Sequence, residues 1–221
     1  MRGKFEEQLS ILSAMLTEMG ALAETAIAAS AEALEKPDAA LAGQAIALDQ
    51  DVDNKTKEIE SLCLKLLLHQ QPVATDLRLI SSVLKMSTDL KRIGNQAVNI
   101  AELAAALNEP PYSGKLEYVL RMSEAAQKMV TGCIDAFVHK DARLAEQVIA
   151  YDDVVDDLFA KARLNLIELI RKDGGGAEQA INLIMIAKYL ERIGDHAVNI
   201  AGWIIFYITG GPAGQKEQKA T

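Results

Sequence analysis

Apolar residues recur along the chain at the period of an α-helix, beginning with its first segment. There they are separated alternately by four and three residues, which places them on one side of a long amphipathic helix. They are Phe5, Leu9, Leu12, Leu16, Met19, Ala23 and Ala26. Pro37 ends this helix near Leu34, and Asp38 can cap the next helix.

The same period predicts five further helices, and no segment shows the alternation of a β-strand. The expected helices cover residues 38–69, 75–107, 116–138, 141–171 and 177–208. Six helices of this length are typical of two elongated three-helix bundles. The sequence therefore predicts an all-α fold of two tandem, pseudo-symmetric bundles.

An internal repeat supports this division. Residues 90–101, LKRIGNQAVNIA, and residues 190–201, LERIGDHAVNIA, share nine of twelve residues at a spacing of 100. Upstream, an Asp-x-x-Val-Asp pattern at 49–53 returns at 152–156, at a spacing of 103. Three residues are therefore missing from the second copy, and we expect the loss in the glycine-rich segment 172–176. Two homologous halves follow from this repeat.

The expected domain boundaries follow from the segments rich in proline and glycine. The first bundle covers residues 1–107 and the second covers residues 115–209. A linker at 108–114 contains two prolines and a glycine. The last residues, 210–221, are polar and are expected to form a disordered tail.

Composition excludes some classes of function. A net charge of −8 argues against a nucleic-acid-binding protein, which needs a basic face. The two cysteines, Cys63 and Cys133, are not repeated between the halves and are expected to be buried thiols in a reducing compartment. No signal peptide is visible, and the longest apolar run, 200–208, is about half the length of a membrane span. We therefore expect a cytoplasmic protein.

Two pairs of carboxylates in the second half are candidates for metal binding. Glu191 and Asp195 are four residues apart, as are Asp152 and Asp156 on the preceding helix. This spacing places each pair on one edge of its helix. If the pairs face each other, four hard oxygen ligands are available to a cation such as Mg²⁺, Mn²⁺, iron or Zn²⁺. The alternative is a solvated acidic face, and either would lie on the surface of the bundle.

Other motifs point to packing rather than chemistry. Gly94 and Gly194 lie within helices, where glycine indicates close approach of a neighbouring helix. The three histidines lack the Glu-x-x-His spacing of di-iron bundles, and no P-loop, Cys-x-x-Cys motif or nucleophile triad is present. These observations favour a protein that is not an enzyme.

The repeated phrases at 90–101 and 190–201, the Asp-x-x-Val-Asp pairs and the segment 71–78, QPVATDLR, resemble the PhoU family of phosphate-regulation proteins. The resemblance implies two three-helix bundles and a cytoplasmic negative regulator that links the Pst phosphate ABC transporter to the PhoR–PhoB two-component system. The implied partners are the Pst ATPase component and a PhoR-type sensor kinase, which would hold the protein at the membrane periphery. The resemblance is compatible with a homodimer.

The resemblance also implies metal clusters bound by Glu/Asp-x-x-x-Asp motifs. The four second-half carboxylates match these motifs. In the first half Asp49 and Asp53 match, but their partner positions hold Lys91 and Asn95, although Asn99 and Glu102 on the same edge could add oxygen ligands. Because an ammonium repels a divalent cation and can pair with the aspartates, we expect this first site to be degenerate.

Two other functions remain open at the level of sequence. One is a PhoU-like accessory role for a different phosphate or ion transporter. The other is a metal-binding bundle with a storage or enzymatic role.

Overall fold

The computed structural model describes residues 2–36, 39–69, 72–107, 116–172 and 177–211. These residues form six helices and no strand, as predicted. The helices are α1 (Arg2–Glu35), α2 (Ala39–His69), α3 (Ala74–Ala106), α4 (Glu117–His139), α5 (Ala142–Lys172) and α6 (Ala177–Thr209). The predicted linker, the shortened segment at 173–176 and nearly all of the predicted tail lie outside the described residues.

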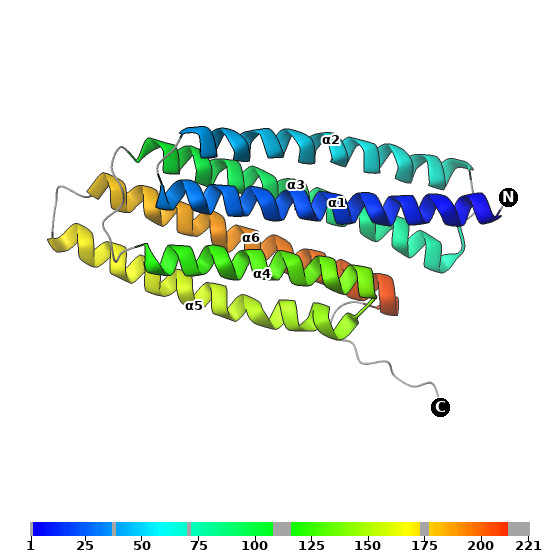
Figure 1. Cartoon of the computed structure of the whole chain (residues 1–221). Helices are drawn as coiled ribbons and strands as arrows, with labels where there is room; N and C mark the ends of the chain where they lie inside the picture. Colours follow the sequence, from blue (N-terminus) through cyan, green and yellow to red (C-terminus); the bar gives the residue numbers. More distant parts are fainter. Residues whose placement is uncertain (1, 37–38, 70–71, 108–115, 173–176, 212–221) are drawn as a thin grey trace, which may run out of the picture.

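The helices form two three-helix bundles that lie side by side (Figure 1). One bundle consists of α1, α2 and α3, and the other of α4, α5 and α6. The bundles meet where α3 packs against α6 and α1 packs against α4, which leaves α2 and α5 on the outside. The predicted fold class is thus confirmed. One hydrophobic cluster includes buried residues of all six helices, so the two bundles share their core, and their assignment as separate domains stays a prediction.

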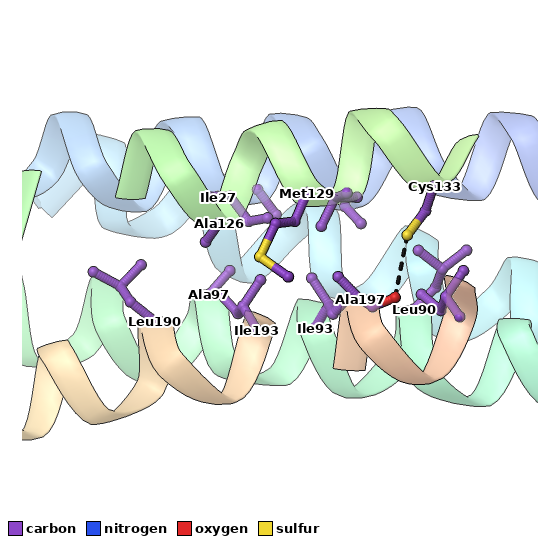
Figure 2. Close-up of a cluster of buried hydrophobic side chains, with 14 of the residues drawn as sticks. Ile27, Leu90, Ile93, Ala97, Ala126, Met129, Cys133, Leu190, Ile193 and Ala197 are labelled. Atoms are coloured by element: carbon purple, nitrogen blue, oxygen red, sulfur yellow. Dashed lines mark hydrogen bonds between the residues drawn. The ribbon is translucent and has the colours of Figure 1, made fainter. Parts of the chain in front are cut away.

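The centre of this shared core contains the two copies of the repeated phrase (Figure 2). Ile93 and Ala97 of α3 face Ile193 and Ala197 of α6, and all four side chains are fully buried. Met129 of α4 packs onto them from the other side. The apolar residues of each repeat therefore join the bundles, whereas positions 91 and 191 of the repeat lie at the edges shared with α2 and α5.

Both cysteines are free thiols in the core, as predicted. The Cys133 Sγ atom donates a hydrogen bond to the carbonyl oxygen of Ala197 at 3.2 Å (Figure 2). Burial raises the pKa of Cys63 to about 12 and raises the pKa of Cys133 further. Neither thiol is therefore a nucleophile at neutral pH.

The turn between α4 and α5 is short and well defined. Lys140 has a left-handed backbone, with φ of 53°, and ends α4. Asp141 then caps α5, because its Oδ1 atom accepts hydrogen bonds from the backbone N–H groups of Arg143 and Leu144 at 2.9 and 3.2 Å. The predicted start of this helix at Asp141 agrees with the cap. The turn places α4 and α5 side by side in opposite directions.

By length and composition alone, the segment Gly3–Glu35 of α1 is apolar enough to cross a membrane. Its most apolar side, which includes Leu12, Leu16, Met19 and Ala23, is fully buried against the other helices. Packing within the bundle therefore accounts for its composition.

Candidate metal centre

The two repeated glycines lie beneath aspartates of the neighbouring helices. A Cβ atom on Gly94 of α3 would lie 2.8 Å from the Oδ1 atom of Asp49 in α2. A Cβ atom on Gly194 of α6 would lie 3.1 Å from the Oδ1 atom of Asp152 in α5. The next contacts, at 3.5 Å in each case, are to the equivalent residues Val52 and Val155. The predicted close approach is confirmed, and the contact that requires glycine is with a carboxylate.

The four second-half carboxylates lie near one another at the α5–α6 edge. Burial, and then the negative charges of Asp156, Asp195, Asp153 and Glu191 in that order, raise the pKa of Asp152 to about 6. Asp152 is half-buried, whereas Asp156 and Asp195 are exposed. Like charges are therefore concentrated around Asp152, which is an arrangement that a bound cation would relieve.

A lysine occupies part of this acidic edge. The Nζ atom of Lys188 forms an ion pair with the Oε2 atom of Glu191, three residues further along α6. The same ammonium lies 5.5 Å from the centroid of the Phe159 ring. The Glu191 side chain is only 17% exposed, so this ion pair is shielded from solvent on one side. Lys188 was not among the residues predicted from the sequence, although its i,i+3 spacing from Glu191 was a usable signal.

The chemistry of these donors fits a hard divalent cation, but the side chains are not arranged around one. Within the described residues, no group of three or more His, Cys, Asp or Glu side chains has a geometry that could hold a metal ion. Glu191 would have to exchange Lys188 for the ion, and the neighbouring carboxylates would have to converge. The metal centre therefore stays a prediction.

The first-half edge carries internal cations in place of carboxylates. Asp53 forms ion pairs with Lys57, at 2.6 Å, and with Lys91. Hydrogen bonds from these two lysines lower the pKa of Asp53 to about 2. Burial, and then the charge of Asp53, raise the pKa of Asp49, while Lys91 lowers it in part. The expected pairing of Lys91 is confirmed, and among the described residues no hydrogen bond joins Asn99 to either aspartate.

A further polar pair joins the two bundles. The Nδ1 atom of His196 in α6 lies 2.9 Å from the Oδ1 atom of Asp89 in α3, and their side chains are only 15% and 10% exposed. The repeat aligns His196 with Gln96, whose Oε1 atom is buried without a hydrogen-bond partner among the described residues. Asp89 was not predicted from the sequence. The available signal was its position within the buried stripe of α3, next to Leu90.

Comparisons with known proteins agree with this duplicated architecture. The sequence matches the family described as PhoU domain twice, over residues 16–104 and 119–204. The chain is 36% identical over 207 residues to the "Phosphate-specific transport system accessory protein PhoU homolog" of Clostridium acetobutylicum, covering 93% of this chain and 94% of that protein. It is also 36% identical to the homologue of the same name from Pseudomonas aeruginosa, covering 94% and 86% of the two proteins.

The fold is also similar to that of solved structures, and this match again covers most of the chain. The crystal structure of PhoU from Pseudomonas aeruginosa superposes with a TM-score of 0.88, at 35% identity, covering 94% of this chain and all of that one. The family match covers both halves of the chain, and the relatives are matched over nearly their full length. The chain therefore belongs to the PhoU family.

Proposed function

We propose that this protein is a non-enzymatic accessory protein of a phosphate ABC transporter and a negative regulator of the phosphate regulon. In this role it links the Pst transporter to PhoR–PhoB signalling from the cytoplasmic side of the membrane. The observation that supports the proposal is the doubled PhoU domain, together with relatives that are named as phosphate-specific transport system accessory proteins.

Deletion of the gene tests the regulatory part of the proposal. A reporter driven by a phosphate-starvation promoter should be expressed in phosphate-rich medium when the protein is absent, because a negative regulator has been removed. Expression of the wild-type chain should restore repression. A reporter that stays silent in the deletion strain would contradict this role and would favour an accessory function for another transporter.

Capture of partners tests the link itself. Tagged protein isolated from cells grown in high and in low phosphate should carry the Pst ATPase component and a PhoR-type kinase. Recovery of the subunits of a different transporter, in the absence of both, would contradict the proposed partners.

The second candidate function is metal binding at the α5–α6 edge. It is favoured by the raised pKa of Asp152, whose largest cause is burial and whose further causes are the charges of Asp156, Asp195, Asp153 and Glu191. Asp152, Asp156, Glu191 and Asp195 would hold the ion, and the ion would neutralise their mutual repulsion. The ion would thereby tie α5 to α6.

A further inference from the structure

Two arginines recur at the same position of each repeat, and packing does not account for them. Arg92 of α3 and Arg192 of α6 begin the Arg-Ile-Gly sequences at 92–94 and 192–194, and both side chains are exposed. The isoleucine and the glycine of each copy are buried. Neither arginine forms an ion pair or a hydrogen bond with another described residue. The core therefore explains the apolar residues of this sequence and leaves its arginines without a structural role.

The two arginines lie at the same level of the contact between the bundles. The helices α3 and α6 run in opposite directions (Figure 1), and the 2.9 Å contact between Asp89 and His196 fixes their alignment. Arg92 follows Asp89 by three residues and Arg192 precedes His196 by four, so the two levels differ by about one residue, or about 1.5 Å. These spacings also place each arginine next to a residue that faces the other helix. Packed helix axes are about 8–10 Å apart, a distance that two arginine side chains span together.

The nearby carboxylates leave this pair of arginines with a net positive charge. Asp89 is engaged by His196. Glu191 and Asp195 lie toward α5, where their charges raise the pKa of Asp152. Two arginines and one aspartate at the contact line therefore give a local excess of positive charge in a chain whose net charge is −8. Such a position favours an anion.

A buried acceptor lies beside the arginines. Gln96 follows Arg92 by four residues, which places it one turn further along the same side of α3. Its Oε1 atom is buried and has no hydrogen-bond partner among the described residues. A buried oxygen in a folded protein normally accepts a hydrogen bond. The site therefore combines two guanidinium groups, which donate hydrogen bonds, with one oxygen that requires a donor.

A tetrahedral oxyanion that keeps a proton satisfies both requirements. The planar fork of arginine donates two parallel hydrogen bonds to adjacent oxygens of a phosphate. Hydrogen phosphate also carries an O–H group, which can donate to Gln96. Sulfate at neutral pH has no proton to donate, and a phosphate monoester has almost none at pH 8, because its second pKa is about 6.

We propose that Arg92, Arg192 and Gln96 bind hydrogen phosphate at the line where the two bundles meet. Because the arginines belong to different bundles, the bound ion joins α3 to α6. The inference goes beyond the regulatory role proposed above and does not depend on it, since it concerns a ligand of this chain and not its partners. It also uses other residues than the candidate metal centre.

Titration with inorganic phosphate tests the proposal directly. Calorimetry on the full chain at pH 8, with low ionic strength and a chelator to exclude metal, should give one site. The dissociation constant should be on the order of 1 mM, which is within the limit of binding energy per atom for so small an ion. Sulfate, which has the same charge at this pH, should bind at least about fivefold more weakly because it leaves Gln96 without a donor. The absence of phosphate binding, or equal binding of sulfate, would overturn the proposal.

A phosphate monoester distinguishes free phosphate from a phosphorylated partner. O-phosphoserine at pH 8 should bind about as weakly as sulfate, because it also lacks the proton. Tighter binding of O-phosphoserine than of inorganic phosphate would assign the site to a phosphorylated protein and refute the proposed ligand.

Matched arginine variants locate the site. Arg92→Gln and Arg192→Gln should each weaken phosphate binding by about tenfold, the effect of losing one charge-assisted contact. Arg163→Gln is the control, because Arg163 is an exposed arginine of α5 that forms no ion pair with another described residue. It should leave binding unchanged. Equal effects of the three variants would show attraction to charge alone, which contradicts a defined site.

Variants of Gln96 test the acceptor. Gln96→Met removes the oxygen, so the affinity for phosphate should fall to that for sulfate. Gln96→Glu keeps an acceptor and should retain the preference for phosphate over sulfate, although its charge weakens the binding of both ions. Circular dichroism and urea unfolding verify that the variants are folded. A folded Gln96→Met protein that still prefers phosphate, or a folded Gln96→Glu protein that does not, would show that this residue does not select the ion.

Discussion

The carboxylate of Asp49 lies directly over Gly94, with its Oδ1 atom 2.8 Å from the point that a Cβ atom would occupy. The Oδ1 atom is buried and has no hydrogen-bond partner among the described residues. The carboxylate thus occupies the space of the missing side chain. Glycine here costs about 1 kcal/mol of helix propensity relative to alanine. An alanine at this position would recover that propensity only by displacing the Asp49 carboxylate.

A comparison of glycines tests this explanation. Gly202 lies in the same helix as Gly194, but a Cβ atom there would meet nothing within 4 Å. Gly202→Ala should therefore raise the free energy of unfolding by about 0.5–1 kcal/mol, the gain in helix propensity. Gly94→Ala should not show this gain, because the Asp49 side chain must move to make room for the methyl group. Its free energy of unfolding should therefore be about 1–2 kcal/mol lower than that of Gly202→Ala. Urea unfolding measures both values, and equal stabilisation of the two variants would contradict the steric role.

The helices and their repeat were predictable from the sequence because both depend on local patterns. Pro37 and the buried stripe of α1 determine where that helix ends and which side faces inward. The repeat also identified Gly94 as a point of close approach. It could not identify Asp49 as the contacting group, because the facing residue depends on how α2 is placed against α3.

Pairs between distant residues were the part that the sequence did not reveal. His196 and Asp89 are 107 positions apart, and they meet only because α3 packs against α6 in the observed register. Lys188 was overlooked for a different reason. Its spacing from Glu191 is local, but many lysines in an acidic chain have such a neighbour, and only the structure shows which one forms the ion pair.

The His196–Asp89 pair should contribute to the stability of the whole molecule. His196→Ala leaves a buried carboxylate without its hydrogen bond and should lower the free energy of unfolding by about 2 kcal/mol. His196→Gln introduces the residue present at the equivalent position 96. It should lower the free energy of unfolding by less than half as much, because the glutamine amide can still donate a hydrogen bond to Asp89. His139→Ala, at an exposed site, should change stability by less than about 0.5 kcal/mol. A double-mutant cycle with Asp89→Ala measures the coupling, and additive effects would show that the pair contributes nothing.

Stability should depend on pH through Asp152. Its pKa in the folded protein, about 6, lies above the ordinary value of 3.8. The folded state therefore binds the proton more tightly than the unfolded state, and the resulting stabilisation is complete below the ordinary pKa and lost as pH rises through 6. Asp152→Asn removes this dependence.

In the presence of a chelator, Asp152→Asn should gain stability relative to wild type as pH rises from 5 to 7. The gain should be on the order of 0.5–1 kcal/mol, since solvent screens a half-buried carboxylate. Asp153→Asn, at the exposed neighbouring position, is the control and should show a smaller gain. Parallel pH profiles for wild type and Asp152→Asn would contradict the raised pKa.

Metal binding should be confined to the second half and limited there by Lys188. Calorimetry with Mn²⁺ should give one class of sites in wild type, weakened by alanine at each of Asp152, Asp156, Glu191 and Asp195. The apo forms of these variants should lose little stability, because each change also relieves repulsion. If Glu191→Ala binds Mn²⁺ with the same stoichiometry as wild type, then the four carboxylates form a solvated acidic face and not a metal site.

Lysine substitutions test the internal cations of both halves. Lys188→Met removes an ammonium that competes with the metal ion for Glu191. The affinity for Mn²⁺ should then rise about tenfold, because a unit positive charge about 6 Å from a divalent ion costs about 1.4 kcal/mol in water. Lys161→Met is the control, because Lys161 pairs with Asp157 on the exposed face of α5 at 3.0 Å. Lys91→Glu with Asn95→Asp restores the missing carboxylates of the first half and should create a second site. If the Lys188 variant binds no more tightly than the Lys161 variant, then the ammonium on Glu191 does not limit access of the ion to this edge.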